Sequence, residues 1–152
     1  MSARTLEVAR TYVGVREVGH NRGPHVTRWL AEAGAKPGDP WCAAFVNHVV
    51  GEAGHRCDVR YPASCRSWVA WAIDHRAIVD KPRRGDLVVY DWDGDGPDDH
   101  IGVVSRLVSF GALVSLTAVE GNTRGKGGRL DGVYEMKRTI RRSRLVFIRP
   151  SP

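Results

Sequence analysis

The stretch GDPWCAAFVNHVV, residues 38–50, places a cysteine at the expected start of a helix. Asp39 is a favourable N-cap and Pro40 suits the first helical position, so the sequence predicts a helix from Pro40 to about Ala53. Cys42 then lies in the first turn, where unpaired backbone N–H groups and the helix dipole stabilise a thiolate. This placement indicates a nucleophile. The alternative is that a small cysteine in this apolar stretch only fills the core.

Helices surround this segment, and strands follow them. The spacing of apolar residues predicts helices from about Ser2 to Val13 and from Pro24 to Gly34, and Ser64 is the expected cap of a fourth helix. After Pro82 the pattern changes to short β-rich runs at 87–92, 100–107, 112–120, 133–136 and 145–148. Helices followed by a meandering antiparallel sheet define an α+β fold, expected as a single domain over residues 1–152.

A thiol nucleophile needs a base, and His100 is the preferred candidate. It begins the run at 100–107, so its imidazole can face the start of the helix that bears the cysteine. We expect this run and the run at 112–120 to form a hairpin that pairs residue 100 with residue 120. Glu120 or Asn122 would then lie beside the imidazole and orient it.

The remaining histidines and cysteines are weaker candidates. His48 is six residues beyond Cys42 on the same predicted helix, so it points away from the sulfur. Cys57 and Cys65 are interpreted as ordinary core or cap residues, and a Cys57–Cys65 bridge stays open. Three cysteines without a CxxC pair give no support for a structural zinc site.

Four short motifs occur in a characteristic order. A Cys follows Trp at a helix start in 38–50, a Gly-Asp pair and a His-x-Gly strand lie in RGDLVVYDWDGDGPDDHIGVV at 84–104, and VEGNT at 119–123 ends a strand. Together they resemble the CHAP family of cysteine, histidine-dependent amidohydrolases/peptidases, within the papain-like and NlpC/P60-like group. The resemblance implies a papain-like fold and assigns the site: Cys42 as nucleophile, His100 as base, Glu120 as the group that orients His100, and Asn122 as a further polar member.

The resemblance also implies an activity. Members of the family cleave peptidoglycan, as N-acetylmuramoyl-L-alanine amidases or as endopeptidases within the peptide, and many are phage endolysins. The expected partner is therefore bacterial peptidoglycan, and the chemistry requires no cofactor. The chain departs from papain-type sites at Lys36, which stands where those sites have an oxyanion-stabilising Gln six residues before the nucleophile.

The acidic run before His100 has a calcium-loop spacing. Asp91, Asp93, Asp95 and Asp99 occupy positions 1, 3, 5 and 9 of such a loop, but Gly102 stands at position 12, where an EF-hand has Glu. Calcium-binding relatives use acidic clusters placed before the nucleophile instead. A calcium site and an acidic hairpin turn therefore both stay open.

The charge of the chain defines the rival hypotheses. Lys and Arg number 23 against 17 Asp and Glu, which gives a net charge of +6 and favours an anionic partner. Many of these cations lie in 123–152, where they suit attraction to anionic wall polymers. The alternative to a peptidoglycan hydrolase is a basic nucleic-acid-binding module or a non-catalytic wall-binding module. No nucleic acid is expected, because no aromatic residues alternate with the cations and no helix-turn-helix or zinc-finger spacing appears.

Length and hydropathy bound the setting in which the protein acts. No apolar stretch approaches the roughly 20 residues that span a bilayer, so no membrane partner is expected. The start, MSARTLEVAR, lacks the apolar core of a signal peptide. We therefore expect a monomer made in the cytoplasm that acts on the wall after release, or as a component of a virion.

Overall fold

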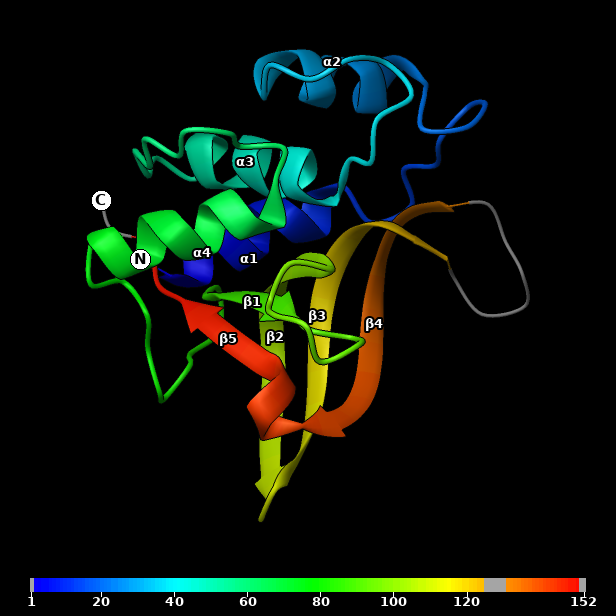
Figure 1. Cartoon of the computed structure of the whole chain (residues 1–152). Helices are drawn as coiled ribbons and strands as arrows, with labels where there is room; N and C mark the ends of the chain where they lie inside the picture. Colours follow the sequence, from blue (N-terminus) through cyan, green and yellow to red (C-terminus); the bar gives the residue numbers. More distant parts are fainter. Residues whose placement is uncertain (1, 125–130, 151–152) are drawn as a thin grey trace.

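The computed structural model describes residues 2–124 and 131–150. Its helices precede its strands, as the sequence predicts (Figure 1). The helices are α1 (Ser2–Thr11), α2 (Pro24–Glu32), α3 (Cys42–Glu52) and α4 (Cys65–Asp74), and the strands are β1 (Leu87–Tyr90), β2 (His100–Phe110), β3 (Leu113–Arg124), β4 (Asp131–Arg141) and β5 (Leu145–Ile148). A short 3-10 turn, Arg142–Arg144, joins β4 to β5. In the described part of the chain, no helix is both long and apolar enough to cross a bilayer.

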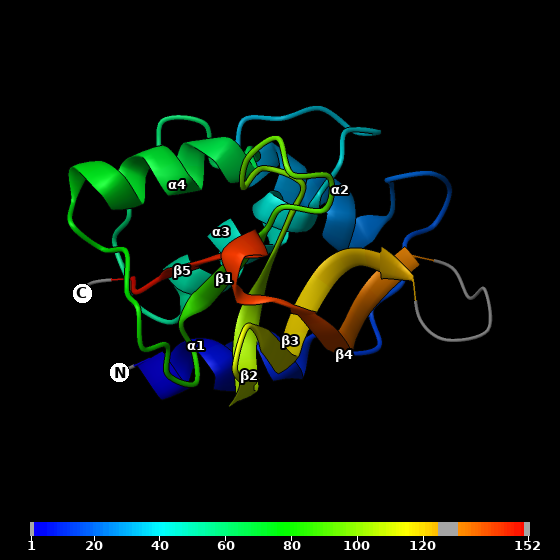
Figure 2. The ribbon, with the colours of Figure 1, turned by 60° about the horizontal axis from the view of Figure 1, so that its bottom comes forward.

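The strands form one antiparallel sheet in the order β4-β3-β2-β1-β5. The helices lie on one side of this sheet, with α3 between α2 and the strands (Figures 1 and 2). The main core therefore joins apolar helix residues to one face of the strands, and includes Trp29, Phe45, Ile101 and Val119. A smaller core on the other face includes Leu116 and Phe147. The predicted α+β class with an antiparallel sheet is confirmed.

The predicted start of the cysteine-bearing helix is wrong by two residues. Helix α3 begins at Cys42, and its N-cap, Trp41, provides no side-chain cap. The expected cap, Asp39, instead accepts a hydrogen bond from the backbone N–H of Lys36, at 2.9 Å, in the preceding turn. Cys42 is consequently the first residue of the helix, where its backbone N–H has no intrahelical partner.

The cap predicted for the fourth helix is confirmed. The Ser64 side chain accepts a hydrogen bond from the backbone N–H of Ser67, at 3.3 Å. Helix α4 therefore begins at Cys65, so a second cysteine also occupies the first position of a helix.

The predicted pairing of residue 100 with residue 120 is wrong. In the β2–β3 hairpin Val103 pairs with Val119, and the register shifts between Val104 and Arg106 because β2 carries a bulge there. Gly102 consequently lies against Glu120: a Cβ at Gly102 would come 2.8 Å from Glu120 Cγ. The absence of a side chain at this position leaves the space that the Glu120 side chain occupies.

A second close approach joins the end of β3 to α3. The register between β3 and β4 shifts between Glu120 and Thr123, and a Cβ at Gly121 would lie 2.8 Å from both Trp41 Cζ3 and Phe45 Cβ. Gly121 therefore allows the backbone of β3 to touch the first turn of the cysteine-bearing helix.

We predict that Gly121→Ala destabilises the fold by about 1–3 kcal/mol, because the added methyl group overpacks a site with no room for it. Urea denaturation measures the free energy of unfolding. Gly51→Ala is the matched control, because a Cβ at this exposed position in α3 meets no atom within 4 Å. Equal stabilities for the two variants would contradict the close packing of β3 on α3.

Candidate active site

Cys42, His100 and Glu120 come together where α3 and β2 begin and β3 approaches its end. The Cys42 thiol interacts with the His100 imidazole, and this interaction lowers the pKa of Cys42 and raises that of His100. His100 Nε2 lies 2.8 Å from Glu120 Oε1. Because Nε2 is engaged by the carboxylate, Nδ1 is the ring nitrogen left for the sulfur. The three side chains form a continuous series of thiol, imidazole and carboxylate.

The carboxylate of Glu120 is fully buried and receives hydrogen bonds from side chains on both sides of its strand in the sheet. The Tyr90 hydroxyl on β1 donates to Oε2 at 2.8 Å. Arg138 on β4 donates through Nε to Oε2 at 3.1 Å and through Nη2 to Oε1 at 2.7 Å. With His100, these donors satisfy both oxygens and hold the carboxylate in one orientation.

These contacts set the charges of the imidazole and the carboxylate. Burial by itself would raise the pKa of Glu120, but hydrogen bonds from His100 and Arg138 outweigh it and lower the pKa to about 2. Burial would likewise lower the pKa of His100, but hydrogen bonds and charge from Cys42 and Glu120 raise it to about 9. At neutral pH the site therefore contains an imidazolium between two anionic partners.

The sulfur of Cys42 carries the negative charge. A hydrogen bond from the Cys65 thiol lowers the pKa of Cys42 well below its usual value, and His100 and the backbone N–H of Ala43 act in the same direction against burial. The hydrogen bond with Cys42 and burial raise the pKa of Cys65, and the charge of Asp98 adds to this effect. Cys65 therefore keeps its proton while Cys42 is a thiolate.

Cys65 is a buried member of the main core, as the sequence predicts, and it also contacts the reactive cysteine. Its sulfur lies 3.7 Å from that of Cys42, and both residues are buried. All three cysteines are free thiols, so the Cys57–Cys65 bridge that the sequence left open is not formed. Cys57 is only half-buried, and burial, followed by the charge of Asp58, raises the pKa of its thiol to about 11.

Asn122 lies next to this series rather than within it. It has a φ of 54°, an uncommon conformation for a residue other than glycine, at the register shift of β3. Its side chain lines a cleft of about 440 Å³ together with His100 and Trp92. The Trp92 ring is 45% exposed and stacks on Tyr90 at a centroid distance of 4.5 Å. The cleft thus offers a flat apolar surface and an amide beside the imidazole.

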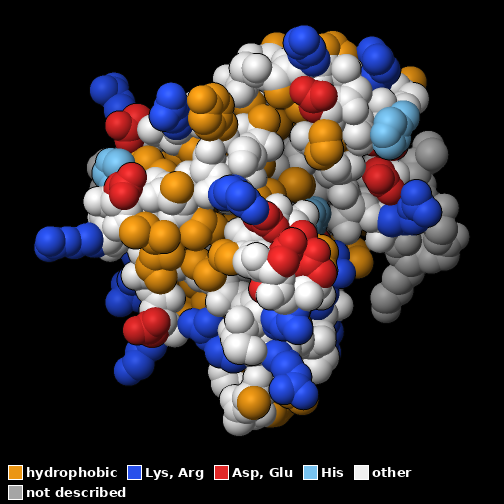
Figure 3. All heavy atoms as spheres, in the orientation of Figure 1, with side chains coloured by type: hydrophobic (Ala, Val, Ile, Leu, Met, Phe, Trp, Pro, Cys, Tyr) orange, Lys and Arg blue, Asp and Glu red, His pale blue; other side chains and the backbone are white. Residues whose placement is uncertain are grey.

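The four acidic residues predicted as calcium ligands lie close together. Asp91, Asp93, Asp95 and Asp99 place carboxylate oxygens within 4.8 Å of one another. Acidic side chains form a group near the middle of the face in Figure 3. In this structure three of them also close turns: Asp91 accepts from the N–H of Gly94, Asp93 from that of Asp95, and Asp99 from that of Trp92. These donors suit an acidic hairpin turn, and calcium stays a prediction.

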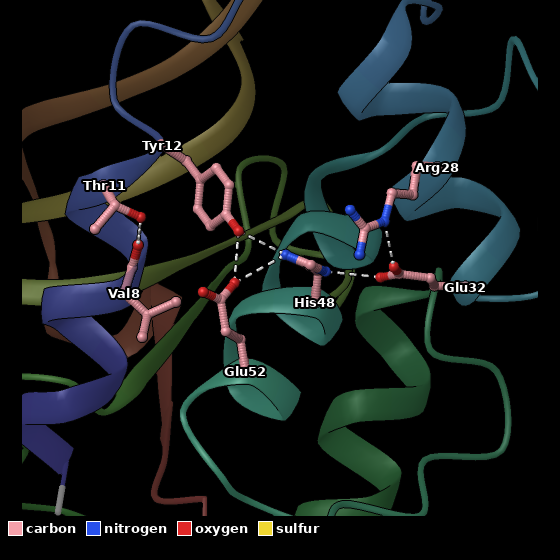
Figure 4. Close-up of polar contacts among 7 residues, drawn as sticks. All are labelled: Val8, Thr11, Tyr12, Arg28, Glu32, His48 and Glu52. Carbon is pink, nitrogen blue, oxygen red and sulfur yellow. Dashed lines mark hydrogen bonds and ion pairs between the residues drawn. The ribbon is translucent and has the colours of Figure 1, made fainter.

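His48 belongs to a separate polar cluster (Figure 4). Its Nδ1 lies 2.7 Å from Glu32 Oε2, and its Nε2 lies 3.0 Å from Glu52 Oε2 and 2.9 Å from the Tyr12 hydroxyl. Both ring nitrogens are therefore engaged away from Cys42, which confirms that His48 does not face the sulfur.

The cavity beside His48, of about 930 Å³, is larger than the cleft beside His100. It contains Cys57 as its only lining cysteine among the described residues. Since the raised pKa of Cys57 keeps this thiol protonated, the larger cavity lacks an activated nucleophile. We assign the chemistry to the smaller cleft.

A thiolate at a helix N-terminus, hydrogen-bonded to an imidazolium that a buried carboxylate orients, defines a cysteine-dependent hydrolase site. Comparison with family models agrees: the CHAP domain model matches residues 34–122. The chain belongs to this family of cysteine, histidine-dependent amidohydrolases/peptidases, which assigns it an amidase or peptidase activity on peptidoglycan. Searches of curated proteins and of solved structures gave no significant match.

Three contributors to the site were missed in the sequence. Arg138 was counted only with the basic residues at 123–152, and Tyr90 and Trp92 only with a β-rich run. Nothing local marks Arg138 as different from the other arginines of its segment. Tyr90 and Trp92 alternate where the β-rich run enters the acidic loop, which is the pattern of side chains that share one face of an extended segment.

We predict that Arg138→Met destabilises the protein by on the order of 3 kcal/mol and lowers hydrolysis, because it removes two donors from a buried carboxylate. Arg141→Met is the matched control: it deletes the same charge from an exposed position on the same strand. Urea denaturation and release of peptides from purified peptidoglycan measure the two effects. Equal effects of the two substitutions would show that only net charge matters.

Proposed function

We propose that the protein hydrolyses an amide bond of peptidoglycan through a Cys42 thiolate, with His100 as acid and base and Glu120 as the residue that orients His100. The observation that carries the proposal is the series of contacts from Cys42 through His100 to Glu120, with the carboxylate fully buried. The cleaved bond is either the amide between muramic acid and the stem peptide or an amide within the peptide. The protein serves as a phage lysin or a bacterial wall hydrolase.

In the first step the thiolate of Cys42 attacks the carbonyl carbon and the carbonyl oxygen becomes an oxyanion. The backbone N–H of Cys42, unpaired at the start of α3, is the first donor for this oxyanion. The imidazolium of His100 then transfers its proton to the leaving amine, and the carbon–nitrogen bond breaks. A thioester on Cys42 and a neutral His100 remain.

In the second step water hydrolyses this thioester. His100 accepts a proton from the attacking water, the carbon–sulfur bond breaks, and the acid product leaves. The thiolate and the imidazolium are then restored. Glu120 supports both steps, because its negative charge stabilises the imidazolium and its position fixes the ring.

Asn122 and Trp92 line the cleft beside His100. The amide of Asn122 can hydrogen-bond the peptide backbone or the sugar, and the exposed ring of Trp92 can stack on an apolar face of the substrate. We assign Asn122 to substrate contact rather than to proton transfer, because no hydrogen bond joins it to His100 in the described structure.

We predict that Cys42→Ala abolishes release of soluble peptides from purified peptidoglycan, because the substitution removes the nucleophile, and that the fold is retained. Cys57→Ala is the matched control and should keep full activity, since Cys57 lies beside a different cavity. Circular dichroism checks the fold of both variants. Hydrolysis by the Cys42 variant would contradict the thiolate mechanism.

Mass spectrometry of the fragments that the active protein releases identifies the peptidoglycan bond that it cleaves. Stem peptides that begin with intact N-terminal alanine indicate an amidase, and fragments cut inside the peptide indicate an endopeptidase. Binding of duplex DNA with a steep salt dependence, without wall hydrolysis, would favour the nucleic-acid alternative.

We predict a bell-shaped pH profile of kcat/KM with its alkaline limb near pH 9, where His100 loses the proton that the leaving amine requires. Glu120→Gln should move this limb to lower pH, because the carboxylate raises the pKa of His100, and should reduce turnover by about 10- to 10⁴-fold.

Asn122→Ala provides the comparison for the pH measurement. It should cost less activity and leave the alkaline limb in place, since Asn122 is not hydrogen-bonded to the imidazole in the described structure. An alkaline limb that stays unchanged in the Glu120 variant would show that Glu120 does not control the protonation of His100.

A further inference from the structure

A second buried thiol lies against the reactive sulfur. Cys42 Sγ and Cys65 Sγ are 3.7 Å apart, and each residue is 7% exposed. The two cysteines occupy the first positions of α3 and α4, so the N-termini of two helices meet at this pair. In the proposed amide hydrolysis the Cys65 thiol donates a hydrogen bond to Cys42 but forms no covalent bond.

The two sulfurs are in different protonation states, which suits oxidation of one sulfur and attack on it by the other. The thiolate is the form of cysteine that reacts with peroxides, and an adjacent thiol can then attack the oxidised sulfur. Cys42 has His100 and the N–H of Ala43 to stabilise its anion, whereas the nearby carboxylate of Asp98 disfavours an anion on Cys65. Cys42 is consequently the sulfur that is oxidised, and Cys65 the sulfur that resolves it.

We propose that Cys42 and Cys65 form a reversible disulfide that switches the hydrolase off in the presence of hydrogen peroxide. In the first step the Cys42 thiolate attacks the peroxide, the O–O bond breaks, and Cys42 sulfenic acid and hydroxide form. In the second step the Cys65 thiol attacks the sulfenic sulfur and water leaves. A dithiol reverses the change by thiol–disulfide exchange and restores both thiols. The loss of activity in this proposal rests on the proposed role of Cys42 as nucleophile.

The geometry requires little movement. The sulfur–sulfur distance must fall from 3.7 Å to a bond length of about 2.05 Å, and this movement is shared between two side chains. Both side chains are on the first turn of a helix, where no preceding turn crowds them. Cys57 has no sulfur partner among the described residues, so it cannot substitute for Cys65 in this reaction.

The test compares the wild-type chain with Cys65→Ser, Cys65→Ala and Cys57→Ser after exposure to hydrogen peroxide. Peptide mapping of the wild-type chain and of Cys57→Ser should show a 42–65 cross-link with a loss of two hydrogen atoms. Their hydrolysis should fall by on the order of tenfold or more and return after treatment with a dithiol. Each variant is compared with its own activity before oxidation.

The two Cys65 variants should also lose activity in peroxide, but a dithiol should not restore it, because Cys42 without a resolving thiol proceeds to sulfinic acid. The absence of the cross-link in the wild-type chain would overturn the proposal, as would full recovery of both Cys65 variants. The cross-link is measured without reference to hydrolysis, so this result is independent of Cys42→Ala, which tests the proposed function.

Discussion

The carboxylate of Glu120 is buried without contact to solvent, and four hydrogen bonds from three other strands of the sheet compensate for the lost hydration. Tyr90 lies on β1, His100 on β2 and Arg138 on β4. Burying the carboxylate is therefore favourable only when these strands are assembled in their observed order around β3. The imidazole that faces the nucleophile is fixed by the same assembly, so the catalytic geometry depends on the packing of the whole sheet.

Charge alternates along the buried site. The Cys42 thiolate, the His100 imidazolium, the Glu120 carboxylate and the Arg138 guanidinium follow one another, so each charge has an opposite neighbour. An isolated buried ion costs several kcal/mol, and an alternating series lowers that cost at every member. The Arg138 guanidinium also lies over the Trp92 ring, 5.0 Å from its centroid, which connects the charged series to the wall of the cleft.

The part of the site that local signals specify could be predicted from the sequence. Cys42 at a helix start and the His-x-Gly and Glu-Gly-Asn motifs identified the residues that meet in the structure. The register of the β2–β3 hairpin could not be predicted, because the bulge in β2 adds a residue without a clear sequence signal. The contacts of Cys65 and Arg138 depend on how α4 and β4 pack against distant segments, and no local pattern encodes that packing.

Net charge is a poor guide to the surface of this protein, because several arginines of its basic C-terminal segment are used internally. Arg138 is bound to Glu120 and Arg149 to the buried Asp86, with Arg149 Nε and Nη2 at 3.0 and 2.8 Å from the two carboxylate oxygens. Arg142 lies over the Phe147 ring. Lys126 and Arg129 lie outside the described residues.

Within the described part of the segment, the exposed cations with no acidic partner are Lys137 and Arg141. Basic side chains on the face in Figure 3 lie around its outline and also near its middle and lower front, with acidic ones among them. A polyanion is bound tightly where many cations contact it together. Two scattered cations do not provide such a row, so attraction to anionic wall polymers, which stays a prediction, rests on fewer charges than the sequence count indicates.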